Sequence, residues 1–160
     1  IYYLDMSHED NIQTSQEECN EIIKIVEGFV GQNYFDGKNN RKITIEDILI
    51  ISPYNAQVNA ISFNLKNKNA RVGTIDKFQG QEAPITIISM TSSDPDNLPR
   101  NKEFFFSRNR LNVAISRAQC ISIILFNSNL LKFMPKTYEQ VKLINNFIKI
   151  KNKYGYGKDD

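Results

Sequence analysis

Hydrophobic positions along the chain fall into two patterns, one typical of buried strands and one typical of amphipathic helices. Residues 48–51 are apolar at successive positions, as expected of a strand covered on both faces, and the mainly apolar residues 85–90 and 121–126 predict two further buried strands. Elsewhere, apolar residues recur every three or four positions, which predicts helices over residues 16–35, 58–65 and 106–118. Shorter strands are predicted at residues 1–6 and 71–74, and exposed loops at residues 36–40 and 94–101.

Two capping boxes mark predicted helix starts. In the first, Ser15 is expected to accept a hydrogen bond from the backbone of Glu18, whose side chain reaches back. The second, at residues 137–140, opens a C-terminal helix whose apolar face is formed by Val141, Ile144, Phe147 and Ile148. The Lys-, Gly- and Tyr-rich residues 151–160 are expected to form a frayed tail.

The alternation of strands and helices predicts an α/β fold. We expect three layers, with a central parallel β-sheet flanked by helices, in one domain over residues 1–150. Functional loops leave the carboxyl ends of the strands in such sheets. The segments after Ile51 and Thr74 and the loop before Arg110 are therefore expected at related edges.

Composition narrows the class of protein. With 41% hydrophobic and 24% charged residues among 160, the chain has the balance of a globular protein and is not disordered throughout. The net charge of +2 is too small to argue nucleic-acid binding, so such binding needs a local surface. Neither a bilayer-spanning apolar run nor a signal-peptide pattern is present, so no membrane partner is expected. Because the sequence begins at Ile1, we expect a piece of a longer protein.

Cysteine and histidine usage gives two further expectations. Cys19 and Cys120 each lie in an apolar periodic segment, which predicts two buried free thiols and a reducing, cytoplasmic location. His8 is the single histidine and has no cysteine neighbour, so no metal site is expected.

The phosphate-binding loops of nucleotide enzymes are missing from the sequence. Neither Gly-x-x-x-x-Gly-Lys-Ser/Thr nor Gly-x-Gly-x-x-Gly occurs. The chain therefore lacks the backbone nest that holds ATP phosphates, which argues against a self-sufficient ATPase and against a free-standing dinucleotide enzyme.

Residues 51–57 form the first of three unusual segments. A strand end, a proline and a helix start predict that Ser52, Tyr54 and Gln57 lie on an exposed rim, where Tyr54 offers a face for base stacking. The alternative is a plain strand–helix turn with Tyr54 packed sideways.

Residues 72–82 form the second segment. Gly80 would permit a close backbone approach to a ligand, and Glu82 would accept from a ribose hydroxyl or orient a cation. The alternative is a turn capped by Asp76, with Glu82 solvated.

Residues 110–117 form the third segment. Helical spacing places Arg110, Ala114 and Arg117 on one face, and Leu111, Ile115 and Ala118 on another that faces the sheet. Two guanidinium groups on one face suit phosphate oxygens, because each is a fixed fork of donors. The alternative is a surface arginine pair with solvated neighbours.

Taken in order, the three segments resemble the C-terminal, second RecA-like motor domain of superfamily 1 helicases. Residues 52–57 are similar to motif IV, residues 72–82 to motif V and residues 110–118 to motif VI. Gly80–Pro84 and Phe106–Arg110 most resemble the 5′-to-3′ group and bacterial-type AAA helicases, some of which are fused to a nuclease domain. The resemblance implies that an upstream motor domain carries the phosphate loop and most contacts to ATP and Mg²⁺.

The resemblance also implies roles for residues of this chain. Arg117 would be the catalytic arginine finger on the γ-phosphate, and the ATP-binding edge would comprise Gly80, Glu82, Arg110 and Arg117. Single-stranded DNA or RNA would lie against the segments that contain Ser52, Pro53, Tyr54, Thr74 and Asp76. The sequence departs from the family pattern at Gln16, Asn109 and Gln119, where relatives carry arginine or another basic residue.

The function expected from these residues is that of the second motor domain of an ATP-dependent helicase or translocase. The isolated fragment is expected to be inactive as an ATPase, because it lacks the upstream half of the site. The alternative is a non-catalytic nucleic-acid-binding or regulatory module that keeps the helicase fold.

Overall fold

The central element is a sheet of six strands, paired in parallel in the order β5-β4-β6-β7-β1-β8. The computed structural model describes residues 1–94, 108–132, 135 and 138–156. The strands are β1 (Tyr2–Asp5), β4 (Ile48–Ile51), β5 (Arg71–Gly73), β6 (Ala83–Ser89), β7 (Ala118–Phe126) and β8 (Gly155–Tyr156). The predicted α/β fold with a parallel sheet is confirmed.

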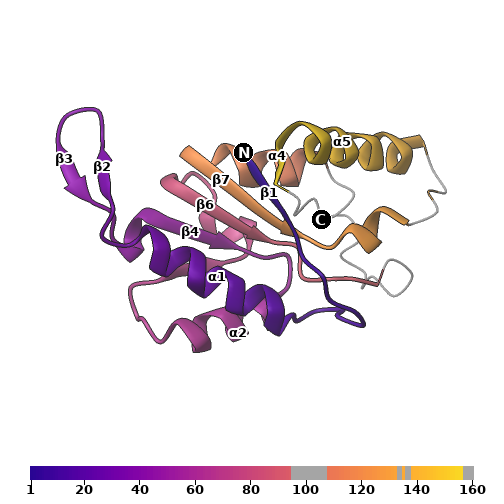
Figure 1. Ribbon diagram of the computed structural model, residues 1–160, viewed down its shortest axis with the longest axis horizontal. Helices are drawn as coiled ribbons and strands as arrows, with labels where there is room; N and C mark the ends of the chain where they lie inside the picture. The colour runs from indigo at the N-terminus through magenta and orange to yellow at the C-terminus, as the bar shows by residue number, and fades with distance from the viewer. Residues whose placement is uncertain (95–107, 133–134, 136–137, 157–160) are drawn as a thin grey trace.

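Helices cover both faces of this sheet, which makes three layers (Figure 1). Helices α1 (Gln16–Phe29) and α2 (Asn55–Leu65) lie side by side on one face. On the other face lie α4 (Arg108–Ser116) and the short 3-10 helix η2 (Ile75–Phe78), while α5 (Tyr138–Tyr154) packs beside β1 and β8. Two further 3-10 helices, η1 (Ile45–Asp47) and η3 (Ser128–Lys132), flank β4 and β7.

The four-residue strand β4 supplies side chains to a separate core on each face. Leu49 and Ile51 belong to the apolar cluster beneath α4 and η2, and Ile48 and Ile50 belong to the one beneath α1 and α2. All four are fully buried, as the unbroken apolar run predicts for a central parallel strand.

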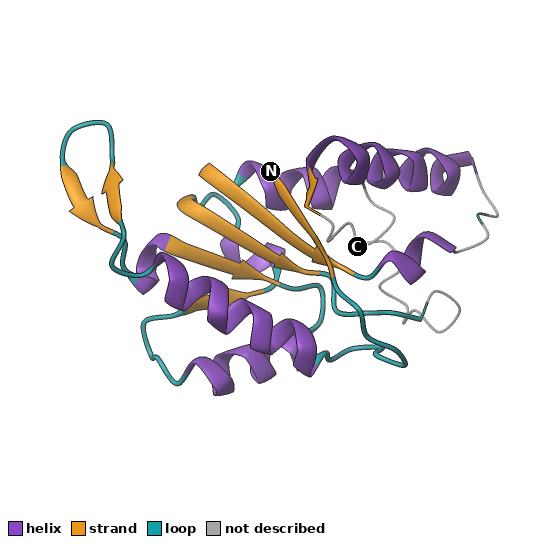
Figure 2. Ribbon diagram, viewed as in Figure 1, coloured by secondary structure: helices purple, strands orange, loops and turns teal. Residues whose placement is uncertain are grey.

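Helix α1 ends at Phe29, six residues before its predicted end at Phe35. Gly31 adopts a positive φ of 88°, a conformation that glycine reaches without steric cost, and turns the chain out of the helix. An antiparallel hairpin follows, made of β2 (Asn33–Phe35) and β3 (Asn40–Lys42), and it stands away from the three layers (Figure 2). The predicted loop at residues 36–40 lies at its tip.

An ion pair anchors this hairpin to the domain. The Arg41 guanidinium donates two hydrogen bonds of 2.7 Å to the Asp47 carboxylate, and it also lies 5.1 Å from the centre of the Tyr34 ring. The Arg41 hydrogen bonds, supported by those from Thr44, hold the pKa of Asp47 at about 2, below its usual range. Two parallel guanidinium–carboxylate bonds fix both distance and orientation.

The C-terminal region is more regular than its composition predicts. Helix α5 continues through Lys151 to Tyr154, and Gly155–Tyr156 then pairs with β1. Val141 and Ile148, two members of the predicted apolar face, are exposed. The second capping box at Thr137 and most of the predicted loop at residues 94–101 lie outside the described residues.

The two cysteines differ from each other. Cys19 is fully buried in α1, as predicted, and burial raises the pKa of its thiol to about 11. The prediction is wrong for Cys120, which is exposed because the first residues of β7 extend past the covered part of the sheet. Among the described helices, none combines the length and the apolar character that crossing a membrane requires.

The Arg41–Asp47 pair gives a pH prediction. A carboxylate whose folded pKa is depressed stabilises the fold above its unfolded pKa, and this contribution is lost as the pH falls from about 4 through about 2. NMR titration of the Asp47 side chain should give a pKa near 2 in the native protein. In Arg41→Gln the pKa should rise toward the ordinary aspartate value of about 4. An unchanged Asp47 titration in Arg41→Gln would contradict the assigned cause.

Candidate functional site

Arg117 and the segment Gly80–Glu82 meet at the amino ends of β6 and β7. Arg117 directly precedes β7, and its carbonyl oxygen accepts a 3.0 Å hydrogen bond from the amide of Ala83, the first residue of β6. Its guanidinium Nη1 lies 3.5 Å from the carbonyl oxygen of Gln81. Motif V-like and motif VI-like residues, 36 positions apart in sequence, are therefore joined by backbone pairing.

Arg110 and Arg117 do not share one helical face. Helix α4 ends at Ser116, where the Arg117 amide donates to the Ala114 carbonyl oxygen, so Arg117 lies beyond the helix. Ala114 is fully buried and faces the sheet with Leu111. Arg110 is exposed, and its Nη1 is 4.0 Å from Asp76 Oδ2 in η2. The predicted common face is wrong because the chain leaves the helix one residue before Arg117.

The Arg117 side chain carries an unsatisfied donor. Its Nε atom is buried and has no hydrogen-bond partner among the described residues, and the side chain as a whole is half-buried. A buried polar group without a partner is costly, and a charged donor is best satisfied by an anion. Because Nε is closed off from solvent, a phosphate oxygen would satisfy it only after the side chain moved.

Gly80 directly precedes Gln81 and lies in open space. Its φ is +76°, and a Cβ atom added there would meet no atom within 4 Å. Glu82 is exposed, and its Oε2 accepts from Gln119 Nε2 at 3.4 Å. The space beside the Gly80 backbone is therefore open, and Glu82 lies on the solvent side.

Arg71 is not among the predicted site residues, but it also contacts this segment, through Gln81 and Glu82. Its guanidinium donates to Gln81 Oε1 at 3.0 Å and to the carbonyl oxygen of Glu82 at 3.5 Å. It also donates to the carbonyl oxygen of Glu46 at 2.9 Å. The sequence did contain a signal for this contact. Arg71 is a basic residue at the start of an otherwise apolar strand, and such a charge needs hydrogen-bond acceptors near that end of the strand.

The predicted nucleic-acid segment after β4 is buried, which corrects the prediction of an exposed rim. Ser52, Pro53, Tyr54 and Gln57 are all buried, and only 4% of the Tyr54 surface is exposed. Burial raises the pKa of Tyr54 well above its usual range. Because β6 and α4 cover this turn, Tyr54 packs in the core and offers no free face for stacking, as the alternative interpretation expected.

The segment after β5 has mixed exposure. Thr74 is half-buried at the start of η2 and makes no side-chain capping bond, whereas Asp76 is exposed in the first turn. Thr74 lies at the carboxyl end of β5, and η2 carries the chain back to the amino end of β6. Thr74 and Arg117 therefore lie at opposite edges of the sheet.

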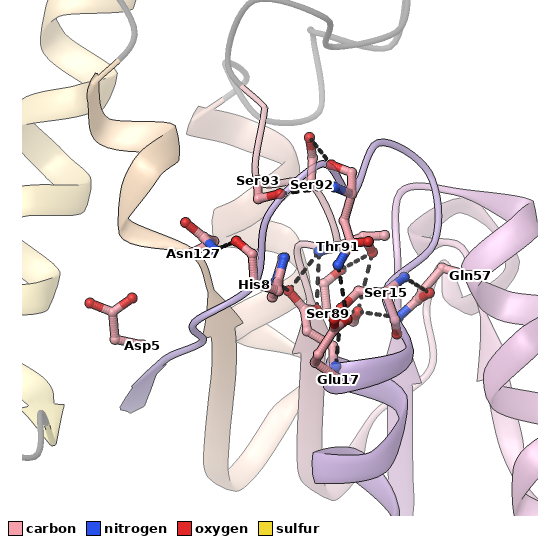
Figure 3. A network of polar contacts seen from close by, with 12 residues as sticks. Asp5, His8, Ser15, Glu17, Gln57, Ser89, Thr91, Ser92, Ser93 and Asn127 are labelled. Carbon is pink, nitrogen blue, oxygen red and sulfur yellow. Dashed lines mark hydrogen bonds and ion pairs between the residues drawn. The ribbon is translucent and has the colours of Figure 1, made fainter.

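A buried polar network lies at the carboxyl edge (Figure 3). The fully buried Glu18 carboxylate accepts from the Thr91 amide at 3.0 Å, from the Ser89 hydroxyl, and lies 3.2 Å from His8 Nε2. Thr91 has a φ of +69°, which is strained for a β-branched residue. The Glu18 carboxylate thus stabilises an unfavourable turn at the end of β6.

Gln57 extends the network to α2. Its Oε1 accepts from the Ser15 amide at 2.8 Å, and its Nε2 donates to the Ser15 carbonyl oxygen and to Ser89 Oγ. Ser15 Oγ accepts from the Glu18 amide at 3.1 Å, which confirms half of the predicted capping box. The other half is wrong, because the Glu18 carboxylate points to β6 instead of back to Ser15.

A sequence signal for this network existed. Glu18 shares the buried face of α1 with Ile22 and Val26, at spacings of four residues. A carboxylate on an apolar face must find internal partners, because a charged group is seldom buried unpaired. The capping-box pattern offered a simpler interpretation of the same residue.

A hollow in the surface lies apart from these residues. The hollow, of about 720 Å³, is lined by residues of α1, the hairpin base and the end of α2, none of which was predicted as a site residue. Within the described ranges, no group of three or more His, Cys, Asp or Glu residues is placed to hold a metal ion.

The network predicts a specific stability loss. Glu18→Ala leaves the Thr91 amide and His8 without their buried acceptor, so the free energy of unfolding should fall by about 3 kcal/mol. Urea unfolding followed by circular dichroism measures the change. Glu21→Ala, which removes a partly exposed carboxylate of the same helix paired with Lys24, is the matched control and should cost roughly 0.5 kcal/mol or less. Equal losses in the two variants would refute the stabilising role of Glu18.

The sequence is similar to short parts of much longer proteins named as helicases. It is 35% identical over 102 residues, 64% of the chain, to an uncharacterized ATP-dependent helicase of Caenorhabditis elegans. It is 32% identical over 143 residues, 84% of the chain, to the DNA replication ATP-dependent helicase/nuclease of Schizosaccharomyces pombe. An RNA helicase of Mus musculus is 36% identical over 96 residues, 56% of the chain. The chain spans only 6%, 10% and 8% of these three relatives, respectively.

The family match covers most of the chain. The sequence pattern of a family described as "AAA domain" matches residues 4–129, from β1 into η3. This range includes all three motif-like segments, Arg117 and the buried network. The family and the names of the relatives support the predicted superfamily 1 helicase domain, and the chain belongs to the AAA domain family.

Proposed function

We propose that this chain is the second motor domain of an ATP-dependent superfamily 1 helicase or translocase, with Arg117 as its arginine finger. The observation that carries the proposal is the contact of the Arg117 guanidinium with the carbonyl oxygen of Gln81, next to the open backbone of Gly80. Three ordered motif-like segments and relatives named as ATP-dependent helicases support it.

We infer a role for each residue at the proposed nucleotide edge. Arg117 would donate to phosphate oxygens and stabilise the negative charge that develops during phosphoryl transfer. Gly80 would allow the backbone to approach the nucleotide, and Glu82 would face its sugar. Arg71 would position this segment through Gln81, and Arg110 would support it through Asp76.

When ATP is bound, hydrolysis of its γ-phosphate supplies the free energy for the motor cycle. In this proposal an upstream motor domain of the same polypeptide holds ATP and Mg²⁺, since the present chain has no phosphate loop. Closure of the two domains would bring Arg117 to the phosphates, and reopening would shift the grip on a single strand.

The proposed contribution to the nucleic-acid groove is indirect for the segment after β4. Ser52, Pro53 and Tyr54 are buried, so they would order the turn that precedes α2 and would not touch bases. Thr74, which is half-buried, and Asp76, which is exposed, would face the nucleic-acid backbone. The Ser52–Thr91 hydrogen bond of 3.1 Å ties this turn to the end of β6.

Finer assignments stay predictions. The 5′-to-3′ direction, the bacterial type, a nuclease domain in the full-length protein and a cytoplasmic location rest on the sequence pattern alone. The relatives include proteins named as DNA helicases and as RNA helicases, so the proposal covers both single-stranded DNA and RNA.

Arg117→Ala in the full-length protein tests the finger. Nucleic-acid-stimulated ATP turnover should fall by about three to five orders of magnitude, because the charge that develops on the phosphate loses its donor. Arg117→Lys should remain strongly impaired, because an ammonium group lacks the planar fork of donors. The measurement is steady-state phosphate release at saturating nucleic acid.

Lys24→Ala is the control for this measurement. Lys24 is exposed on α1, and within the described part of the chain its ion-pair partner is Glu21, so its loss should leave turnover unchanged. Near-normal turnover in Arg117→Ala would refute the finger assignment. Robust ATPase activity of the isolated chain, in a preparation free of other ATPases, would refute the division of the site between two domains.

A further inference from the structure

The β2–β3 hairpin carries an exposed surface that the motor motifs do not account for. Its strands pair Asn33 with Lys42, Tyr34 with Arg41, and Phe35 with Asn40. Successive side chains of a strand point to opposite faces, and directly opposed residues share a face. One face of the hairpin thus carries Tyr34 and Arg41, and the other carries the remaining two pairs.

The face with Tyr34 and Arg41 is used within the domain. Arg41 binds Asp47 and lies over the Tyr34 ring, and the Tyr34 hydroxyl lies 3.8 Å from Cys120 Sγ in β7. These contacts attach the hairpin to the amino edge of the sheet and fix which face it turns outward. The hairpin is therefore held in place by one side only.

The opposite face combines an aromatic ring with a cation and amides. Phe35 is 60% exposed, and Asn33, Asn40 and Lys42 beside it are exposed as well. Lys38 is exposed in the turn at the tip. The Phe35 ring is therefore accessible as a flat apolar face, next to a cation, on a part of the chain that protrudes from the domain.

Charge favours a polyanion as that partner. Residues 33–42 contain Lys38, Arg41 and Lys42 against Asp36, a net charge of 3 − 1 = +2, which equals the net charge of the whole 160-residue chain. Asp36 lies 3.6 Å from Arg41 Nε, so that pair is internally neutral. Lys38 and Lys42 make no ion pair within the described residues, so both ammonium groups are available to phosphates.

We propose that the hairpin is a separate contact for single-stranded nucleic acid, in which a base stacks on Phe35 while Lys38 and Lys42 bind flanking phosphates. Cations next to an exposed aromatic ring are the combination that holds single strands without sequence preference. The hairpin leaves the amino edge of the sheet, whereas Thr74 and Ser52 lie at the carboxyl edge. It is therefore distinct from the motif-derived groove.

The proposal rests on the proposed function in one respect, that single-stranded nucleic acid is the substrate. Its test is direct binding, which does not depend on ATP turnover. A protein segment is the competing occupant of the Phe35 face, and it becomes an outcome of the same experiment.

Binding is measured on the full-length protein by fluorescence anisotropy with labelled oligothymidylate and oligouridylate. Phe35→Ala should weaken binding about tenfold, because the base then has no ring on which to stack. Lys38→Gln combined with Lys42→Gln should reduce the slope of log affinity against log salt by about 1.4, since each lysine–phosphate pair contributes ~0.7 to that slope on a single strand.

Matched variants control for exposed residues elsewhere. Phe63 on α2 is 78% exposed, so Phe63→Ala removes a similar ring from another surface and should leave affinity unchanged. Lys24→Gln with Lys149→Gln, from α1 and α5, removes the same charge and should leave the salt slope unchanged. Circular dichroism should show the native spectrum in every variant, since all six side chains are exposed.

Failure of this proposal differs from failure of the proposed function. The hairpin variants should raise the nucleic-acid concentration for half-maximal ATPase stimulation and leave maximal turnover unchanged, whereas Arg117→Ala lowers maximal turnover. Oligonucleotide affinity and salt slope equal to the native protein in both hairpin variants would overturn the hairpin proposal. That result would exclude nucleic acid as the occupant of the Phe35 face and leave the assignment of Arg117 unaffected.

Discussion

Parallel pairing of β4, β6 and β7 is the constraint on which the arrangement depends. All strands of a parallel sheet point the same way, so every loop that follows a strand lies at one edge and every loop that precedes a strand lies at the other. Arg117 and Glu82 both precede strands, and the hydrogen bond between Ala83 and Arg117 holds them together at the amino edge. Ser52, Thr91 and the Glu18 network lie at the carboxyl edge for the same reason.

The sequence predicted the sheet better than it predicted exposure. The run Ile48–Ile51 is apolar on both faces and the run Ile121–Phe126 is mainly apolar, as is typical of central parallel strands, and their alternation with helical segments indicated the fold class. Arg117 lies next to the Gly80–Glu82 segment because β6 and β7 pair in parallel. The common face of Arg110 and Arg117 failed because helical spacing applies only inside a helix, and Arg117 lies outside it.

The remaining differences between prediction and structure come from tertiary contacts, which the spacing of residues along the sequence does not reveal. The turn at Ser52–Tyr54 resembles an exposed loop in composition, yet it is buried. The Ser52 hydroxyl forms a hydrogen bond with the hydroxyl of Thr91, which lies 39 positions away in the sequence. Glu18 matched a helix-capping pattern, but its carboxylate is satisfied by β6, 71 residues away. The hairpin follows a segment whose apolar residues recur at helical spacing. Gly31 was the one sequence signal that α1 ends before Phe35.

The backbone closes at the base of the hairpin, where the Gly31 amide donates to the Ile43 carbonyl oxygen and the Ile43 amide donates to the Gln32 carbonyl oxygen, both at 2.9 Å. The two ends of the segment are thus fixed before the hairpin strands begin. Since the entropy of closing a loop changes only slowly with its length, residues between these points can be inserted, deleted or exchanged with little effect on the packed layers. This part of the domain is therefore suited to evolve separately from the motor, and it offers a site at which a reporter sequence can be grafted without rebuilding the core.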